Sequence, residues 1–492
     1  MTETRSLDRP SEAVQAADAA DAAEALRAAL AAEAEARGGA LPADLLVFGA
    51  DIPERNLQDW SRQPPVRPLA LARPRSTAEV SAVLAACARA GLAVVPQGGL
   101  TGLVRGAHPV AGGVALSMER LTGVEEVDRE GATMIVRAGT PLHEVQAAAE
   151  AAGLFFPLDL GSRGSCSIGG NVSTNAGGNR VIRYGTARDQ VLGLEVALPD
   201  GTVVNALNRL VKNNTGYDIK HLFIGAEGTL GAITRVALRL QPRPAALDVA
   251  LCALPDYAAL LSLLAGLRAR FGPGLTSFEA MWDEYLDTIT STFELRRPFA
   301  AAHRFYAIVE ISRFGAGEDS RLPDALGELM EEGLIEDALI AQTEREAAEF
   351  WKIREIVGEL RQKAGPLVSY DIGLPAGVTD RFVETSAARV RAQWPDAMHL
   401  AYGHLGDNNL HLIVRSAACG AAQPRDGFDR AIYDTVREFG GSISAEHGIG
   451  TTKRPYLAHS RSPEEIAVMR LVKRALDPQG RMNPGKVVDP EG

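Results

Sequence analysis

One stretch, residues 157–178, restricts the possible folds more than any other part of the sequence. It reads PLDLGSRGSCSIGGNVSTNAGG, a run of small and hydroxyl-bearing residues without a regular apolar period. Such small side chains fill a protein core poorly, but they leave room for a large planar ligand. Serine and asparagine side chains and accessible backbone amides supply hydrogen-bond donors and acceptors. The stretch therefore predicts one wall of a cofactor pocket.

Two further glycine-rich segments fit the same pocket. PQGGLTGL (96–103) follows a short apolar run at 92–95, and GAEGTLGAIT (225–234) precedes a strand-like run. Glycine lets a backbone approach a ligand closely, and successive free N–H groups form a binding site for an anion. Gly98, Gly99 and Gly102, with the Thr101 hydroxyl, suit a pyrophosphate. Either segment alone would be explained equally well as a turn.

Length and charge limit the function classes. With 492 residues the chain is too long for one ordinary core, so two or three domains are expected. The formal net charge of -11 argues against a nucleic-acid partner, which needs a clustered basic face.

Cysteine spacing and the N-terminal segment bear on the compartment. The four cysteines (Cys87, Cys166, Cys252 and Cys419) form no C-x-x-C pair, so neither a zinc knuckle nor a disulfide framework is indicated. Residues 1–40 resemble neither a secretory signal nor a transit peptide, and no stretch approaches a membrane span. We expect a cytoplasmic protein, with peripheral association at a membrane as the alternative.

Local patterns in the first half predict an α+β arrangement of helices and strands rather than strict βαβ alternation. Residues 11–37 indicate an exposed or docked helix, and Ser76–Glu79 is a capping-box sequence that opens a helix ending at Gly91, with Cys87 in the core. A helix is also expected from Thr140-Pro141 to about Ala152. Strand patterns lie near 114–118, 124–128 and 133–137.

The Pro/Ala-rich stretch 241–246 interrupts these patterns and predicts a domain junction. Beyond it, amphipathic helices separate strand-like runs, an arrangement typical of an antiparallel α+β domain. These runs are 249–254, 305–311, 399–402 and 410–414.

Two histidines flank a tight turn in YGHLGDNNLH (402–411). A hairpin closed by this Gly-Asp-Asn-Asn turn would bring the imidazoles of His404 and His411 together. Glu446, in SAEHG, completes a His/His/carboxylate set that suits Zn²⁺ or Mn²⁺. Such an ion could hold a substrate's carboxylate and hydroxyl and lower the pKa of the hydroxyl. The alternative is a structural histidine pair.

Six segments, in this order, resemble the vanillyl-alcohol oxidase type of FAD-binding protein, and within it the branch of D-lactate, glycolate and D-2-hydroxyglutarate dehydrogenases. They are PQGGLTGL, GSCSIGGNVSTNAGG, NNTGYDIKHLFIGAEGTLGAIT, YGHLGDNNLH, SAEHGIGTTKR and MNPGK. The resemblance implies an α+β fold with an FAD-binding domain and a C-terminal antiparallel-sheet substrate domain, the cap. It also implies oxidation of a D-2-hydroxy acid to a 2-oxo acid, with hydride transfer to the flavin N5.

The resemblance and the junction together predict four parts. These are an N-terminal helical segment (1–65), the FAD-binding domain (66–243), the substrate- and metal-binding cap (244–455) and a C-terminal segment that returns to the FAD domain (456–492).

Noncovalent FAD is expected. Several relatives attach the flavin through a histidine in the glycine loop, but this chain has Leu100 there, and its nearest histidine, His108, lies outside the motif. The resemblance implies FAD contacts from Pro96, Gln97, Gly98, Gly99, Leu100, Thr101, Gly102, Leu103, Pro157, Asp159, Gly164, Ser167, Ile168, Gly169, Gly170, Ser173, Thr174, Asn175, Gly177, Gly178, Glu227, Gly228, Gly231, Ile233 and Asn483.

Opposite the flavin, the resemblance assigns His404, His411 and Glu446 as metal ligands and His447 as the catalytic base. A neutral histidine suits removal of a hydroxyl proton near neutral pH. Arg354 matches a family arginine that contacts the substrate carboxylate, a role suited to a guanidinium fork. A surface ion pair is the alternative for Arg354.

The chain departs from the hydroxyglutarate pattern at three positions. The family threonine, lysine and asparagine fall at Gly358, Ser369 and Ile413. Losing a cation opposite a desolvated second carboxylate costs on the order of several kcal/mol. A monocarboxylic or apolar 2-hydroxy acid such as D-lactate is therefore expected, with D-2-hydroxyglutarate as the alternative; Lys352 or Lys363 could replace the missing cation.

No complete G-x-G-x-x-G motif is present, so direct use of NAD is disfavoured. An external electron acceptor is expected instead: a quinone, an electron-transfer flavoprotein or a cytochrome. A homodimer is a further expectation. Two other functions stay open, a flavin-free metal hydrolase built on the His/His/Glu set and a nonredox flavoprotein like the related alkyl-glycerone-phosphate synthases.

Overall fold

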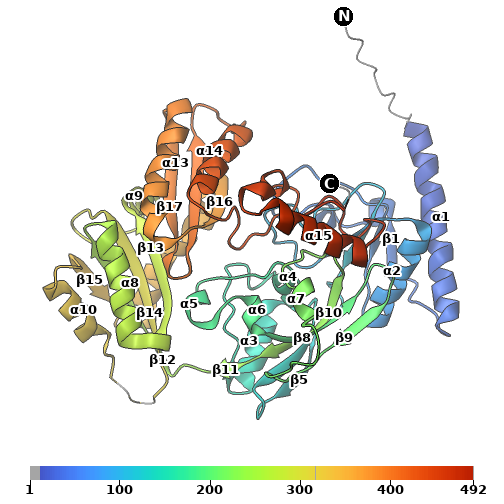
Figure 1. The fold of residues 1–492 in the computed structure, drawn as a ribbon, viewed down its shortest axis with the longest axis horizontal. Coiled ribbons are helices and arrows are strands. Elements are labelled where there is room, and N and C mark those ends of the chain that lie inside the picture. The colour runs from blue at the N-terminus through green and yellow to red at the C-terminus, as the bar shows by residue number, and fades with distance from the viewer. Residues whose placement is uncertain (1–11, 316, 318, 491–492) are drawn as a thin grey trace, which may run out of the picture.

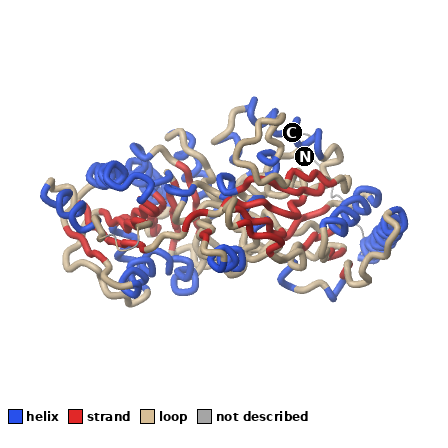
Figure 2. The backbone as a smooth tube through the Cα atoms, turned by 90° about the horizontal axis from the view of Figure 1, so that it is seen from below, coloured by secondary structure: helices blue, strands red, loops and turns tan. Residues whose placement is uncertain are grey.

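A computed structural model describes residues 12–315, 317 and 319–490 (Figure 1). Two halves lie side by side. One carries the glycine-rich segments and has helix α1 (Glu12–Ala36) at its outer edge, and the other is built on a single large sheet. Figure 2 shows the strands of both halves in the interior and most helices on the outside. The mixed helices and antiparallel sheets confirm the expected α+β class.

The first half contains two main sheets. In one, β4 (Val114–Ser117) pairs in parallel with β2 (Ala70–Ala72) and β3 (Val94–Gln97), and β1 (Leu46–Phe48) adds an antiparallel edge. The other is antiparallel, in the order β5 (Val124–Asp128), β6 (Thr133–Arg137), β10 (Ala232–Arg239), β8 (Val191–Ala197) and β9 (Val203–Ala206). A short pair joins β7 (Leu154–Phe155) to β11 (Gln241–Pro242). The three strands expected between residues 114 and 137 are present.

Helix α2 (Thr77–Ala90) begins and ends where the sequence predicts. The Ser76 Oγ accepts a hydrogen bond from the Glu79 N–H (3.2 Å), and Gly91 closes the helix at a φ of 74°. The capping box is only half formed, because the Glu79 carboxylate accepts from the Arg75 N–H (2.7 Å) instead of the Ser76 N–H. Cys87 is buried in the core, as expected.

The N-terminal helix packs against α2. Leu26 and Leu30 of α1 are buried there, and Glu33 forms ion pairs with Arg37 and Arg89. Segment 1–65 also supplies strand β1, which has no clear strand pattern in the sequence. The remaining helices of this half are α3 (Leu142–Ala151), α4 (Ile168–Ser173), α5 (Val181–Tyr184), α6 (Ala187–Gln190) and α7 (Lys220–Phe223).

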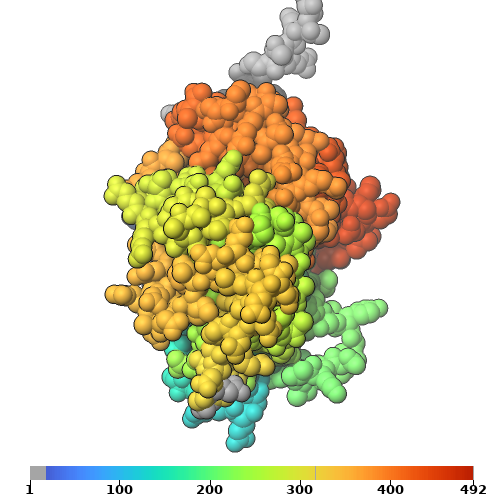
Figure 3. Space-filling view, turned by 90° about the vertical axis from the view of Figure 1, so that its left-hand side faces the viewer, coloured from blue at the N-terminus to red at the C-terminus, as the bar shows by residue number. Residues whose placement is uncertain are grey.

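The cap is built on one seven-stranded antiparallel sheet. The order is β15 (Asp337–Ile340), β12 (Ala246–Leu254), β14 (Phe305–Arg313), β13 (Leu275–Trp282), β17 (Ala397–His404), β18 (Asn409–Ser416) and β16 (Val368–Gly373). All four strand-like runs expected from the sequence lie in this sheet. Figure 3 shows the molecule from the left-hand side of Figure 1, and in this view residues of the cap fill most of the visible surface.

Both faces of the cap sheet are covered, because its strands are apolar on both sides. One face packs against α8 (Tyr257–Phe271), α10 (Leu322–Glu331), α13 (Thr379–Gln393) and α14 (Arg425–Glu438). The other packs against α9 (Asp283–Thr292), α11 (Glu344–Glu355) and α12 (Leu360–Ala364). This second face also carries the polar residues of the candidate site.

The C-terminal segment contacts the first half at β3. After α15 (Pro463–Leu476), the Val94 N–H donates to the Arg481 carbonyl (2.9 Å) and the Asn483 N–H donates to the Val94 carbonyl (2.7 Å). The contact is a single parallel bridge rather than a strand. Among the described residues, no helix combines the length and apolar character needed to cross a membrane.

We predict that His399 makes the fold acid-sensitive. Burial lowers its pKa to about 4, while the unfolded chain takes up the proton near 6.5. The unfolded state therefore binds more protons between these values, and stability falls as the pH drops from about 6.5 to about 4, by roughly 3 kcal/mol in all. His399→Gln should flatten the pH dependence of the free energy of unfolding in this window. Equal slopes for the two proteins would contradict the assignment.

Candidate active site

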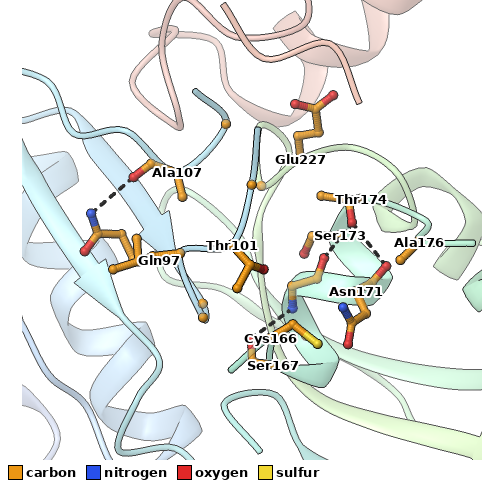
Figure 4. A pocket seen from close by; sticks show the side chains of 18 of the residues that line it. Gln97, Thr101, Ala107, Cys166, Ser167, Asn171, Ser173, Thr174, Ala176 and Glu227 are labelled. Atoms are coloured by element: carbon orange, nitrogen blue, oxygen red, sulfur yellow. Dashed lines mark hydrogen bonds between the residues drawn. The ribbon is translucent and has the colours of Figure 1, made fainter. Parts of the chain in front are cut away.

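A cavity of about 330 Å³ lies where the three glycine-rich segments meet. The loop after β3 forms one wall, and Ser167 and α4 form the facing wall (Figure 4). Many of the expected FAD contacts line it: residues 96–103, Ser167, Gly169, Gly170, Ser173, Thr174, Gly177, Glu227, Gly228, Gly231 and Ile233. Trp60, Met118, Cys166 and Asn171 line it as well, although the sequence did not single them out as contacts.

The other expected FAD contacts lie outside the lining: Pro157, Asp159, Gly164, Ile168, Asn175, Gly178 and Asn483. Several have a local structural role. Asp159 pairs with Arg163 (3.0 Å), and the Asn175 Oδ1 accepts from the Arg188 N–H (2.9 Å) at the start of α6. Ile168 is buried in the core.

The cavity suits a large flavin nucleotide. A Cβ on Gly98 would lie 2.5 Å from the Ser167 Oγ, so the two walls are as close as glycine allows. Asn171 has a buried Oδ1 without a hydrogen-bond partner in the described part of the chain. A bound ligand with donors would satisfy such an atom.

Replacing Gly99 with alanine should force these walls apart. The new Cβ would lie 2.0 Å from the Ser165 carbonyl oxygen and 2.7 Å from the Cys166 Cα, and neither backbone atom can move cheaply. We expect a loss of roughly 1–3 kcal/mol of stability and a lower FAD content per chain, measured by thermal unfolding and visible absorbance. Gly161→Ala is the matched control, because it lines the same cavity with nothing within 4 Å of its Cβ. Equal FAD contents in the two variants would contradict this account.

Glu227 ties the cavity to the cap. Its carboxylate accepts hydrogen bonds from the N–H groups of Ile449 (2.6 Å) and Gly450 (2.8 Å). Its carbonyl accepts from the Asn483 Nδ2 (2.7 Å), which also donates to the Gly106 carbonyl (2.9 Å). Asn483 therefore joins the loops that carry Gly106 and Glu227, two residues that line the cavity.

The β17–β18 hairpin brings the two predicted histidines together. The ring centroids of His404 and His411 lie 5.2 Å apart, and both rings are buried. One ligand atom each from His404, His411 and Glu446 lies within 4.8 Å of the others. A second group with the same property consists of Asp371, His411 and His447. Burial and the nearby cations His404 and Arg354 lower the pKa of His411, so its imidazole is neutral, the form that binds a metal.

The histidine cluster adjoins the cofactor cavity. Glu446 and His447 both line it. The Glu446 Oε1 accepts a hydrogen bond from the Gly178 N–H (2.9 Å), and a Cβ on Gly177 would lie 2.7 Å from the same oxygen. The cap carboxylate thus contacts the 157–178 wall directly.

Asp371 holds the Glu446–His447 loop, a role that the sequence did not reveal. Its buried Oδ2 accepts from the backbone N–H groups of Ala445, Glu446 and His447 at 2.9 to 3.1 Å. Although burial opposes it, the neighbouring His447 and Lys453 side chains and these N–H groups lower the pKa of Asp371 and keep it ionised. The loop is therefore fixed at three consecutive residues.

Arg354 is buried and is not a surface ion pair. Its Nε donates to the Glu279 Oε2 (2.8 Å), and its guanidinium lies 4.5 Å from the ring centroid of Tyr402. The other oxygen of Glu279, Oε1, lies 2.5 Å from the His404 Nδ1. Burial lowers the pKa of His404, but Glu279 and Glu446 outweigh it and raise the pKa to about 9. Glu279 was also missed in the sequence.

The three positions that depart from the hydroxyglutarate pattern carry no cation. Ser369 of β16 pairs with Ile413 of β18, two residues along the strands from the Asp371–His411 pair. Ile413 is buried in the apolar cluster of that face, and nothing lies within 4 Å of a Cβ built on Gly358.

The sequence matches two known families. Residues 68–207 match the family described as FAD binding domain, and residues 243–487 match the C-terminal domain of FAD linked oxidases. The D-2-hydroxyglutarate dehydrogenase of Xanthomonas citri pv. viticola is 38% identical over 91% of this chain and 93% of its own length. The mitochondrial D-2-hydroxyglutarate dehydrogenase of Bos taurus is 40% identical over 87% of this chain and 78% of its own.

Solved structures share the fold at low sequence identity. p-Cresol methylhydroxylase superposes with a TM-score of 0.74 at 13% identity, covering 96% of this chain and 97% of that one. An alkyldihydroxyacetonephosphate synthase gives 0.70 at 18% identity, covering 92% and 83%. The chain therefore belongs to the FAD-linked oxidases, with the vanillyl-alcohol oxidase type of fold, in the branch of the D-lactate, glycolate and D-2-hydroxyglutarate dehydrogenases, and is an FAD-dependent oxidoreductase.

Proposed function

We propose that the protein oxidises the alcohol carbon of a D-2-hydroxy acid to the 2-oxo acid where the cofactor cavity meets the cap. The observation that carries this proposal is that Glu446 lines the cavity and also belongs to the His404–His411 group. Relatives named D-2-hydroxyglutarate dehydrogenase support the substrate class. Because the two matched families are described as an FAD binding domain and as FAD linked oxidases, we set the flavin-free hydrolase aside.

His447 is the proposed base. It belongs to a possible metal group, but of the five residues in the two groups only it and Glu446 line the cavity. His447 takes the hydroxyl proton, and noncovalent FAD, when bound, supplies the acceptor for the hydride from the same carbon. The product is the 2-oxo acid, and the two electrons leave through an external acceptor.

Substrate binding is assigned to the buried side chains of the cap. Arg354 is the proposed partner of the substrate carboxylate, with its Nε engaged by Glu279 and its Nη2 3.5 Å from the His404 Nε2. His404, His411 and Glu446 would hold a divalent ion, Zn²⁺ or Mn²⁺, which would lower the pKa of the substrate hydroxyl.

We favour a monocarboxylic or apolar substrate such as D-lactate, because Gly358, Ser369 and Ile413 offer no cation to a second carboxylate. D-2-hydroxyglutarate is the second candidate. It is favoured by the relatives and by Arg361, which is half-buried, follows Gly358 by three residues and has no ion pair with any residue in the described ranges.

The test is a comparison of kcat/KM for D-lactate, L-lactate, D-2-hydroxyglutarate and an apolar D-2-hydroxy acid, with an artificial electron acceptor. At least a tenfold preference for the monocarboxylic D-acids supports the favoured substrate. A preference for D-2-hydroxyglutarate that Arg361→Gln removes supports the second candidate. Flavin that no hydroxy acid reduces would contradict the proposal and favour a nonredox flavoprotein.

The remaining proposals concern organisation and partners. We propose the four-part division at residues 65, 243 and 455, which the separate sheets and the start of the second family match at residue 243 support. We also propose a cytoplasmic location, supported by the wide spacing of the four cysteines. A quinone, an electron-transfer flavoprotein or a cytochrome is the proposed acceptor, and the homodimer stays a prediction.

A further inference from the structure

Glu279 is a buried carboxylate in the middle of the cap sheet. It belongs to β13, its side chain is fully buried, and its register partner on β17 is His404. An apolar residue would be the stable choice at such a place, because burying an ion pair rarely stabilises a fold more than good apolar packing. A carboxylate here therefore calls for a functional explanation.

The two oxygens of Glu279 hold two different groups. Oε2 accepts from the Arg354 Nε at 2.8 Å, and Oε1 lies 2.5 Å from the His404 Nδ1. Because Nδ1 is engaged, only Nε2 of His404 stays available to a metal, and this nitrogen lies 3.8 Å from the Glu446 Oε1. The Arg354 Nη2 lies 3.5 Å from the same Nε2.

The backbone of Arg354 is held independently. The Tyr285 hydroxyl donates to the Arg354 carbonyl at 2.9 Å, and the Tyr402 ring packs against the guanidinium. What neither contact determines is the rotation of the guanidinium about its own axis. The Glu279 carboxylate constrains this rotation through its hydrogen bond from the Arg354 Nε, and the same carboxylate orients the ring of His404.

We propose that Glu279 is a positioning residue that holds Arg354 and His404 in one geometry and so sets the separation between the substrate-carboxylate site and the metal ligands. This inference rests on the proposed function and deepens it. A 2-hydroxy acid bound at both points could present its hydroxyl-bearing carbon in only a narrow range of orientations. Glu279 thereby contributes to catalysis without contacting the substrate.

The experiment compares Glu279→Gln, Glu279→Asp and wild type as purified FAD-containing proteins, stripped of metal for the binding measurement and supplied with Zn²⁺ or Mn²⁺ for the kinetic one. Glutamine replaces one of the two acceptor oxygens with an NH₂ donor, so only one of the two positions held by Arg354 and His404 keeps its acceptor, and aspartate keeps the charge but is too short to reach both. One readout is the Kd for ZnCl₂ and MnCl₂, and the other is the KM for the best hydroxy acid. We expect a 10- to 100-fold weaker metal affinity and a raised KM in both variants, at unchanged FAD content.

Glu310→Gln is the matched control. Glu310 is also buried on the same sheet, opposite Ser277 two residues from Glu279, but it contacts neither Arg354 nor His404. Its variant should keep the wild-type Kd and KM. If Glu279→Gln does not fold, Glu279→Asp decides alone.

The outcomes separate the two proposals. A folded Glu279 variant with wild-type metal affinity and wild-type KM overturns the positioning role. Wild-type values in Glu279→Asp also overturn it, because they would show that only the negative charge of Glu279 matters. If the wild type binds metal but no hydroxy acid reduces its flavin, the proposed function fails and the metal affinities still decide the role of Glu279. A wild-type protein that binds neither metal nor hydroxy acid overturns both.

Discussion

Replacing His447 with asparagine lowers kcat by about 10²- to 10⁴-fold while the protein keeps its FAD, because asparagine cannot accept the substrate proton. The structure places His447 at the cavity with its side chain 24% exposed, so it can meet a substrate there. Its N–H donates to Asp371, and this backbone contact survives the substitution. Rapid-mixing measurement of flavin reduction isolates the chemical step.

The control for this experiment is His459→Asn. His459 also lies beside an aspartate, with its Nε2 3.1 Å from the Asp434 Oδ1, but it does not line the cavity. Its variant should reduce flavin at the wild-type rate. If His447→Asn reduced flavin as fast as wild type, the proton would have another acceptor and His447 would not be the base.

The second large effect is expected from Glu446→Gln. The glutamine oxygen can still accept from the Gly178 N–H, so the contact between the cap and the cofactor wall is retained. The negatively charged ligand is lost, however, and a metal that stabilises a developing alkoxide contributes several kcal/mol, or about 10²- to 10³-fold in rate. We expect that loss in flavin reduction, together with a weaker Kd for Zn²⁺ or Mn²⁺.

Chelation gives the same prediction by another route. Dialysis of the wild type against a strong chelator should lower the rate to the level of Glu446→Gln, and one of the two ions should restore it. Chelated wild type that keeps its full rate would show that the His404–His411–Glu446 group is structural.

Much of the fold follows from local patterns. Four of the cap strands, β12, β14, β17 and β18, are apolar runs long enough to be recognised singly, whereas β13, β15 and β16 were not predicted. The ends of α2 follow from Ser76 and Gly91, which act within one turn of the helix. Strand β1 has three residues, too few for any periodicity, and only its pairing with β2 defines it.

The residues of the candidate site likewise fall into those that the sequence could predict and those that it could not. His404 and His411 could be paired from the sequence because one turn separates them. Glu279 and Asp371 could not, because their partners come from distant segments and only the strand register sets them beside His404 and His411. A signal was present nonetheless, since LTSFEAMW and VSYDIG each carry one acidic residue within an otherwise uncharged buried strand.

The central claim is that this flavoprotein dehydrogenates 2-hydroxy acids, and the most direct measurement is the visible spectrum of the oxidised protein under anaerobic conditions. D-lactate, D-2-hydroxyglutarate and their L-enantiomers would be added in turn. Our account predicts that a D-2-hydroxy acid bleaches the flavin band, with an equimolar amount of the 2-oxo acid formed. A yellow protein that keeps its full absorbance with every acid would contradict it.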